Sequence, residues 1–263
     1  MKNIIKTSLL ALALVAAFSP AANAQKKMKN EDVAKALEGY FTLATSPSAT
    51  PDEKGFIRRW MLLDPISLIN STNRVFTDSY SRDVIMTEYF PEQFTCLPKD
   101  GDKVKVEMDY QAPVDLTSNR RPQMGAEPEA PKKVKANLYW HALDSDHFFV
   151  KLFRFATNLN LTRHGTIFWH VTVINCEEEM KDVRLSVGCN TASMWWVNGE
   201  EVMFLATDRH MVVDDGVSQK ITLHKGKNIL RGCTINGIGM TEMCARFLDN
   251  TGKPITNYTI TLD

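Results

Sequence analysis

The amino-acid sequence predicts a mainly β protein, an antiparallel β-sandwich or jelly roll with a short N-terminal helix. From Phe56 onward, short runs rich in aromatic and β-branched residues follow one another at regular spacing. Turn signals such as Asn198-Gly199 and Asn250-Thr251-Gly252 separate these runs. Because helical segments do not alternate with the runs, we expect the strands to pair antiparallel rather than in a parallel sheet.

The N-terminus predicts export. Lys2 and Lys6 form a positive region, Leu9–Phe18 is an apolar run, and Ala22-Asn23-Ala24 offers small residues to a signal peptidase. We therefore expect residues 1–24 to be cleaved as a signal peptide. The apolar run is too short for a membrane anchor, and no comparable run follows it. The mature protein is expected to be periplasmic or secreted and not membrane-spanning.

Two further segments are predicted after the signal peptide. Residues 25–53 form an N-terminal helix and linker, in which Asn30–Leu43 is the helix, capped by Asn30, and Ser46–Pro51 is a polar linker. The helix is expected to be an appendage, with its apolar face formed by Val33, Leu37, Tyr40 and Phe41. Residues 54–263 form the β-sandwich domain, with enough length for a well-buried core.

The strands of this domain are predicted from aromatic and β-branched runs, and the region between two of them is expected to be a loop. Residues 115–133 are rich in Pro, Arg, Glu and Gln and lack aromatics, which favours a mobile loop. The predicted strands are Phe56–Leu63, Lys103–Tyr110, Lys135–Leu143, Phe148–Phe155, Thr166–Ile174, Val183–Val187, Ser193–Val197, Glu201–Leu205, Ser218–Leu223, Asn228–Ile235, Met243–Leu248 and Ile255–Leu262.

Charge and cysteine content exclude some classes of protein. The chain has 31 basic and 31 acidic side chains, and this balance argues against nucleic acid as a partner. Five cysteines leave at least one thiol unpaired, and none forms a CxxC motif. Cys233 and Cys244 lie in apolar runs and are expected to be buried thiols. A Cys176–Cys189 disulfide stays open as an alternative in an oxidising compartment.

The sequence carries no common enzyme signature in a suitable context. The sequence contains no GxSxG, HExxH, P-loop or GxGxxG motif in a suitable context, and its six histidines lack paired spacing. We expect a non-catalytic protein without a cofactor. Asp144-Ser145-Asp146 has carboxylates that can contribute to a structural calcium site. An ordinary hairpin turn, in which the Asp side chains bond the local backbone, is the favoured interpretation.

Two adjacent tryptophans in the second half of the chain are candidates for an exposed position. Trp195 and Trp196 are adjacent in one predicted strand, so their side chains point to opposite faces of the sheet. One of them is therefore expected on an outer face or near a loop end, where it can stack on a sugar ring. The alternative is that a loop or the N-terminal helix covers it.

Three stretches of the second half resemble a known family. They are residues 193–202, with Trp196-Val197-Asn198-Gly199; residues 221–230, with Lys225-Gly226-Lys227-Asn228; and residues 244–255, with Ala245-Arg246-Phe247. This pattern resembles the galactose-binding-like jelly roll that accompanies bacterial polysaccharide-degrading enzymes, and Phe56–Ile66 is similar to the first strand of such domains. Where relatives tend to place an aromatic, this chain has Thr241, Glu242 and Met243. The resemblance implies a carbohydrate-related binding or accessory role.

The sequence therefore favours an exported, non-catalytic binding module for a polysaccharide or oligosaccharide. Trp195 is the expected stacking platform, Arg209 and Asn236 are expected donors, and Asp208 is an expected acceptor, because all lie near turns. Two other functions stay open: a structural or protein-interaction sandwich of the cell envelope, and an unrecognised glycan hydrolase or lyase. An exposed apolar patch would favour the former, and convergent titratable groups would favour the latter.

Overall fold

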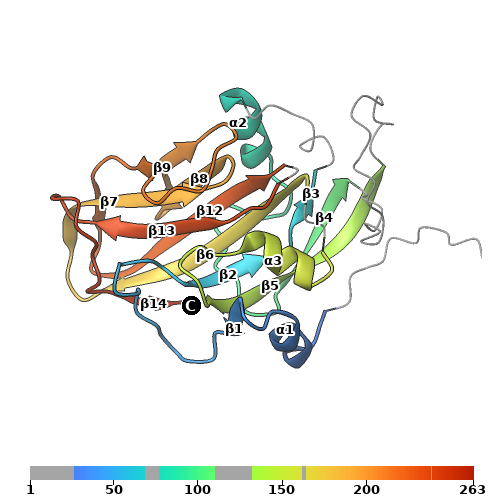
Figure 1. The fold of residues 1–263 in the computed structure, drawn as a ribbon, viewed down its shortest axis with the longest axis horizontal. Coiled ribbons are helices and arrows are strands. Elements are labelled where there is room, and N and C mark those ends of the chain that lie inside the picture. Colours follow the sequence, from blue (N-terminus) through green and yellow to red (C-terminus); the bar gives the residue numbers. More distant parts are fainter. Residues whose placement is uncertain (1–26, 69–76, 110–131, 162–163, 238) are drawn as a thin grey trace, which may run out of the picture.

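The described part of the protein folds as an antiparallel β-sandwich, in agreement with the prediction (Figure 1). The structure, a computed structural model, describes residues 27–68, 77–109, 132–161, 164–237 and 239–263. The predicted signal peptide, and nearly all of the loop predicted over residues 115–133, lie outside these ranges. None of the helices described here has the length and apolar character that crossing a membrane requires.

Ten of the described strands form the larger sheet. Its main path runs β1-β5-β2-β6-β12-β8-β9, while β3 and β14 also pair with β6 and β4 pairs with β5. The centre is the long β6–β12 pair, registered from Gly226 opposite Cys176 to Asn236 opposite Thr166. The strands are β1 (Phe41–Leu43), β2 (Arg59–Leu63), β3 (Ile66–Ser67), β4 (Lys103–Asp109), β5 (Lys133–Ser145), β6 (Thr166–Cys176), β8 (Ser193–Val197), β9 (Glu200–Leu205), β12 (Gly226–Asn236) and β14 (Thr259–Thr261).

The smaller sheet is built around β7 (Met180–Cys189). β13 (Met243–Leu248) pairs with one edge of β7. β10 (Gly216–Val217) and β11 (Ile221–Leu223) pair with β7 at its two ends, so both lie along its other edge. The two sheets enclose a core to which the larger sheet contributes Phe168, Trp195 and Leu230, and the smaller sheet Leu185, Val187 and Phe247.

A second apolar layer covers the outer face of the larger sheet. Helix α2 (Asp78–Met86) and the segment that follows it supply Ile85, Phe90 and Phe94. These side chains pack against strand residues that include Trp169 and Trp196. The centre of the larger sheet is therefore buried on both faces, which explains why almost every residue of β6, β8 and β12 is shielded from solvent, whereas β4 and the start of β5 alternate between exposed and less exposed residues.

Polar anchors hold this covering layer in place. Arg231 of β12 is 3 % exposed, and its guanidinium donates to the carbonyl oxygens of Gln93, at 3.1 Å, and Cys96. Arg82 of α2 donates to both carboxylate oxygens of Glu201 on β9, each at 2.8 Å. The hydrogen bond from Arg82 holds the pKa of Glu201 below its ordinary value. The cover is thus fixed at the centre and at the edge of the sheet.

The N-terminal segment differs from the prediction. Helix α1 spans Asn30–Ala36 and ends before Gly39, whose φ of +82° lies in the left-handed region. The residues after it form β1, which pairs with β5 instead of continuing the helix. Lys29 occupies the N-cap, and the Asn30 side chain donates instead to Asp100 at 3.1 Å. Since Leu37 is buried in the core between the sheets, this segment packs into the sandwich and is not an appendage.

The strand predicted over Phe148–Phe155 is wrong. The chain makes one isolated bridge, from Val150 to Met243, and then forms helix α3 (Leu152–Asn158). Buried positions at Leu152, Phe155, Ala156 and Leu159 follow the three-to-four-residue spacing of a helix. A short apolar run does not distinguish a strand from a buried helix by composition.

Two of the turns that carry the family resemblance are joined by side-chain hydrogen bonds of Asn198 and Asn228. Asn198, with φ of +53°, and Gly199, with φ of +86°, form the tight β8–β9 hairpin, as predicted. The Asn198 amide donates to Asn228 Oδ1 at 2.9 Å, and its own oxygen accepts from the backbone N–H of Ile229. Asn228 is fully buried and also bonds both backbone groups of His224. These asparagines therefore fix the position of two turns.

The arginine of the third motif stretch is a structural anchor as well. Two guanidinium nitrogens of Arg246 donate to the Asp214 carboxylate, and a third donates to the Lys54 carbonyl at 2.9 Å. The guanidinium also lies over the Phe56 ring, 4.8 Å from its centroid. Arg246 thereby ties three separate segments of the chain together.

All five cysteines lie within the described residues and are free thiols. The alternative of a Cys176–Cys189 disulfide is not formed, because Cys176 ends β6 just before β7 begins, whereas Cys189 lies at the far end of β7. Cys233 and Cys244 are buried, as predicted. Burial raises the pKa of the Cys189 thiol to about 11 and that of Cys244 to about 12.

Replacing Asn228 tests the link between the two turns. Asn228→Ala removes the side-chain partner of two partly buried backbone groups of His224 and of the Asn198 amide, so we expect a loss of about 1–3 kcal/mol in the free energy of unfolding. Urea denaturation measures this loss. The matched variant Asn250→Ala, in an exposed turn, should stay within about 0.5 kcal/mol of the parent. Equal stability of the two variants would contradict the assigned role.

The Asp214–Arg246 pair predicts a pH dependence. Burial raises the pKa of Asp214, but hydrogen bonds from Arg246 and Ser186 outweigh this effect and hold it below its ordinary value. The pair therefore stabilises the fold above the unfolded pKa of about 3.9, and the stabilisation disappears as the pH falls through the lower folded pKa. We expect the stability difference between the parent and Asp214→Asn to be largest near neutral pH and to shrink in acid. If the stability of the parent and of Asp214→Asn differed by the same amount at every pH, this role of the pair would be refuted.

Candidate functional site

The structure buries the predicted stacking platform. Trp195 is 0 % exposed and packs against the rings of His170 and Trp60, with centroids at 4.7 Å and 6.1 Å. The two rings of Trp195 and His170 fill the space above Gly232, which leaves no room there for a Cβ atom. Trp195 Nε1 donates to Ser193 Oγ at 3.0 Å. The side chain therefore has no face available to a ligand.

The neighbouring tryptophan is buried on the opposite face. Trp196 is 7 % exposed and stacks on Trp169, with ring centroids 5.8 Å apart and an interplanar angle of 21°. Alternation along β8 does place the two tryptophans on opposite faces, as expected. Neither is exposed, and the alternative of a covering segment applies: α2 and the segment after it, not the N-terminal helix, cover the outer face.

The other predicted ligand residues do not form one site with Trp195. Asp208 is exposed on the loop after β9. The guanidinium of its neighbour Arg209 pairs with Asp215 and donates to the Ala206 carbonyl at 2.6 Å. Asn236 is fully buried at the end of β12. The structure thus brings Asp208 and Arg209 together on one loop, whereas Asn236 and Trp195 lie in the interior.

One of the two predicted calcium candidates, Asp144, has a structural partner for its carboxylate in the described residues. Both carboxylate oxygens of Asp144 accept from Arg59, each at 2.8 Å, and the Arg59 side chain is 2 % exposed. Asp146 is exposed, and its backbone N–H donates to the Tyr40 carbonyl at 2.9 Å. In the described ranges, no three metal-ligating side chains of His, Cys, Asp or Glu converge. Asp144 therefore serves an ion pair with a buried arginine.

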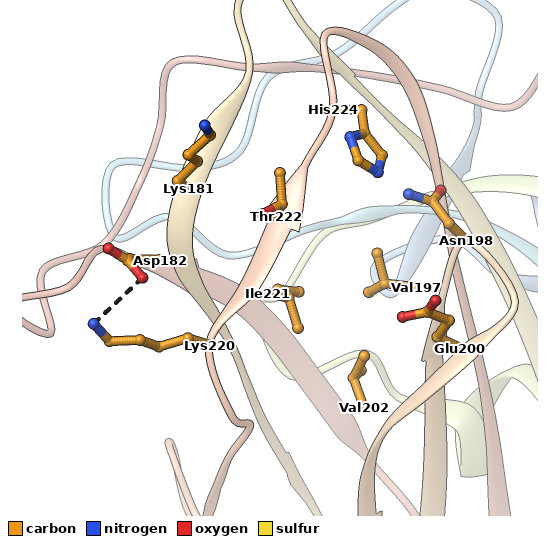
Figure 2. A pocket seen from close by; sticks show the side chains of 10 residues that line it. All are labelled: Lys181, Asp182, Val197, Asn198, Glu200, Val202, Lys220, Ile221, Thr222 and His224. Carbon is orange, nitrogen blue, oxygen red and sulfur yellow. Dashed lines mark ion pairs between the residues drawn. The ribbon is translucent and has the colours of Figure 1, made fainter.

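A surface groove lies between the edges of the two sheets (Figure 2). It has a volume of about 520 Å³ and is open to solvent. The β8–β9 hairpin forms one side, and β7 with β11 forms the other. The residues that line it are Lys181, Asp182, Val197, Asn198, Glu200, Val202, Lys220, Ile221, Thr222 and His224.

The groove combines an apolar floor with a polar rim. Figure 2 shows Val197, Val202 and Ile221 in the middle of the groove, between the two sides. Val197 is 5 % exposed, so the floor is continuous with the core between the sheets. The rim carries ammonium, carboxylate, amide, hydroxyl and imidazole groups from both sides: Lys181, Asp182, Asn198, Glu200, Lys220, Thr222 and His224.

The cations of the rim already face carboxylates. Lys220 lies 3.3 Å from Asp182, the ion pair drawn in Figure 2. Lys181 lies 3.4 Å from Glu179, and His224 Nδ1 lies 3.5 Å from the other oxygen of that carboxylate. Hydrogen bonds from Lys181 and His224 hold the pKa of Glu179 below its ordinary value. Positive charge on the rim is therefore balanced before any ligand binds.

Sequence reasoning located the turns beside the groove but missed the groove itself. Asn198 and His224 belong to stretches that carry the family resemblance, and Asn228 holds both in place. The positions of Asn198 and His224 in these stretches could have indicated one side of the groove. The opposing side, however, comes from β7 in the other sheet, and its distance from the hairpin depends on how the two sheets pack.

Comparisons with known proteins give weak likenesses. No family model matches the sequence, and no curated protein matches it. Among solved structures, a PA14 sugar-binding domain from an RTX adhesin has a TM-score of 0.39 and 9 % identity, covering 77 % of this chain and 96 % of that one. A β-glucosidase from Kluyveromyces marxianus has a TM-score of 0.29 and 15 % identity, covering 78 % of this chain and 20 % of the enzyme. The galactose-binding-like relationship stays a prediction.

The position of Trp195 predicts a large effect on stability. Trp195→Ala should lower the free energy of unfolding by about 3–5 kcal/mol, because it empties a large volume in the core. Chemical denaturation followed by far-UV circular dichroism measures the loss. The milder variant Trp195→Phe keeps most of the ring packing and should lose less. If Trp195→Ala matched the parent in stability, the buried placement would be wrong.

Proposed function

We propose that this protein is an exported, non-catalytic carbohydrate-binding module and that the groove between the sheet edges is its binding site. The observation that carries the proposal is the apolar floor of Val197, Val202 and Ile221 between two rims of hydrogen-bonding side chains. The volume of about 520 Å³ is within the usual range for small-ligand sites. The proposed site therefore differs from the residues that the sequence suggested.

The chemistry of the groove suits a sugar ring. A pyranose has a face rich in C–H groups and an edge of hydroxyl groups, so it needs apolar contact below and hydrogen-bond partners around it. Asn198, Thr222 and Glu200 offer amide, hydroxyl and carboxylate groups at the rim. Because the floor is aliphatic and the rim is exposed, we expect weak affinity, with Kd on the order of 1 mM.

The placement of perturbed titratable groups supports binding without catalysis. Burial, aided by the charge of Arg231, lowers the pKa of His170 to about 3, and burial raises that of Cys189 to about 11. Both groups are fully buried and neither lines the groove. A catalytic acid or base must reach its substrate with a pKa near the working pH. His170 and Cys189 are therefore poor candidates for chemistry in the groove.

Export rests on the features of residues 1–24, and the cysteines are compatible with it. Four of the five thiols are buried, and the pKa of each of the four is raised by burial. A raised pKa reduces the thiolate fraction, and oxidation needs both thiolate and access. The chain can therefore keep these thiols reduced in an oxidising compartment.

Affinity-gel electrophoresis against a panel of soluble polysaccharides tests the proposal. Thr222→Arg places a bulky side chain in the groove, and the matched control Thr42→Arg changes an exposed position on β1. We expect at least one polysaccharide to retard the parent and Thr42→Arg, with the affinity of Thr222→Arg reduced about tenfold or more. Absence of retardation by every polysaccharide would refute carbohydrate binding. Equal retardation of all three proteins would show that the site lies elsewhere.

A further inference from the structure

Two adjacent glutamates at the start of β9 have different surroundings. Glu201 points toward α2, where Arg82 binds both of its oxygens. Because side chains alternate along a strand, Glu200 points to the opposite side, and it lines the groove. Figure 2 shows its carboxylate directed toward the floor near Val197 and Val202. Within the described residues, Glu200 has no ion-pair partner within 4.0 Å.

The rest of the groove has no spare cation to offer Glu200. Lys220 is paired with Asp182, while Lys181 and His224 both face Glu179. Each of these cations already faces a carboxylate, and Glu200 is the carboxylate of the groove lining that has no cation within 4.0 Å among the described residues. The unpaired negative charge of the groove therefore lies at Glu200.

We infer that the groove selects sugars that carry a free amine, with the ammonium group opposite Glu200, and that it disfavours uronic acids and sulfated sugars. This inference rests on the proposed function and specifies its class of ligand. A carboxylate or sulfate in the groove would lie near Glu200 and find both lysines already paired. An ammonium group gains a charge-assisted hydrogen bond to the unpaired carboxylate.

The size of the preference follows from the exposure of Glu200. A solvent-exposed ion pair contributes little, and salt screens it, so we expect a preference of about fivefold at low salt. The neutral analogue of the same ligand should still bind through the floor and the uncharged rim groups. Charge thus adjusts specificity, while the shape of the groove provides the basal affinity.

Isothermal titration with three oligosaccharides of equal length tests the inference: a glucosamine tetramer, its N-acetylated form and an oligouronate. Measurements are made at low salt, below the pKa of the sugar amine. The parent should bind the glucosamine tetramer about fivefold more tightly than the acetylated form, and the oligouronate most weakly. Glu200→Gln should abolish the preference for the amine, whereas Glu107→Gln, an equal charge change on β4, should retain it.

The outcomes separate this inference from the proposed function. Binding of the acetylated and free-amine tetramers with equal affinity, lost in Thr222→Arg, would overturn the inference and leave the groove as a carbohydrate site. Tightest binding of the oligouronate would likewise overturn it. A preference that persists in Glu200→Gln would contradict the role of this carboxylate. If none of the three sugars binds and no polysaccharide retards the protein, the proposed function fails as well.

Discussion

Burial of the central strands of the larger sheet on both faces is the constraint on which the rest of the structure depends. One face packs against the smaller sheet and the other against α2 and the segment after it. Strands of an antiparallel sheet often leave one face to solvent, and the central strands β6, β8 and β12 of this sheet do not. Consequently Trp195 and Trp196 are both interior residues, and the proposed binding site lies at a sheet edge instead. The groove beside β8 and β9 lies at such an edge.

Buried polar residues define how the layers meet. Arg231 fixes the outer cover through backbone carbonyls, and Asn228 joins the turns beside the groove. Arg246 connects Asp214 and Lys54 at the smaller sheet. Each would be costly to bury without partners, and each has them. Two of these three, Asn228 and Arg246, lie in the stretches on which the predicted family resemblance rests, and in this structure both serve the fold.

Local signals predicted much of the fold, whereas long-range packing limited the prediction of the site. Ser193–Val197 and Met243–Leu248 have the bounds expected from their alternation and flanking turns. The apolar run at Phe148–Phe155 led to a wrong strand prediction, because composition does not separate a buried helix from a strand. Exposure of Trp195 depended on whether a covering layer existed, and α2 was not predicted. The groove requires two sheets at a fixed separation, which no single stretch of sequence specifies.

The proposed function places the ligand at the sheet edge and not on a sheet face. A titration of the isotopically labelled protein with a chito-oligosaccharide mixture, followed by backbone amide NMR shifts, tests it most directly. We predict that the largest shifts fall on residues of the β8–β9 hairpin, β11 and the start of β7, around Asn198 and Thr222. Shifts concentrated instead on the loop of Asp208 and Arg209, or on residues remote from both, would contradict the account.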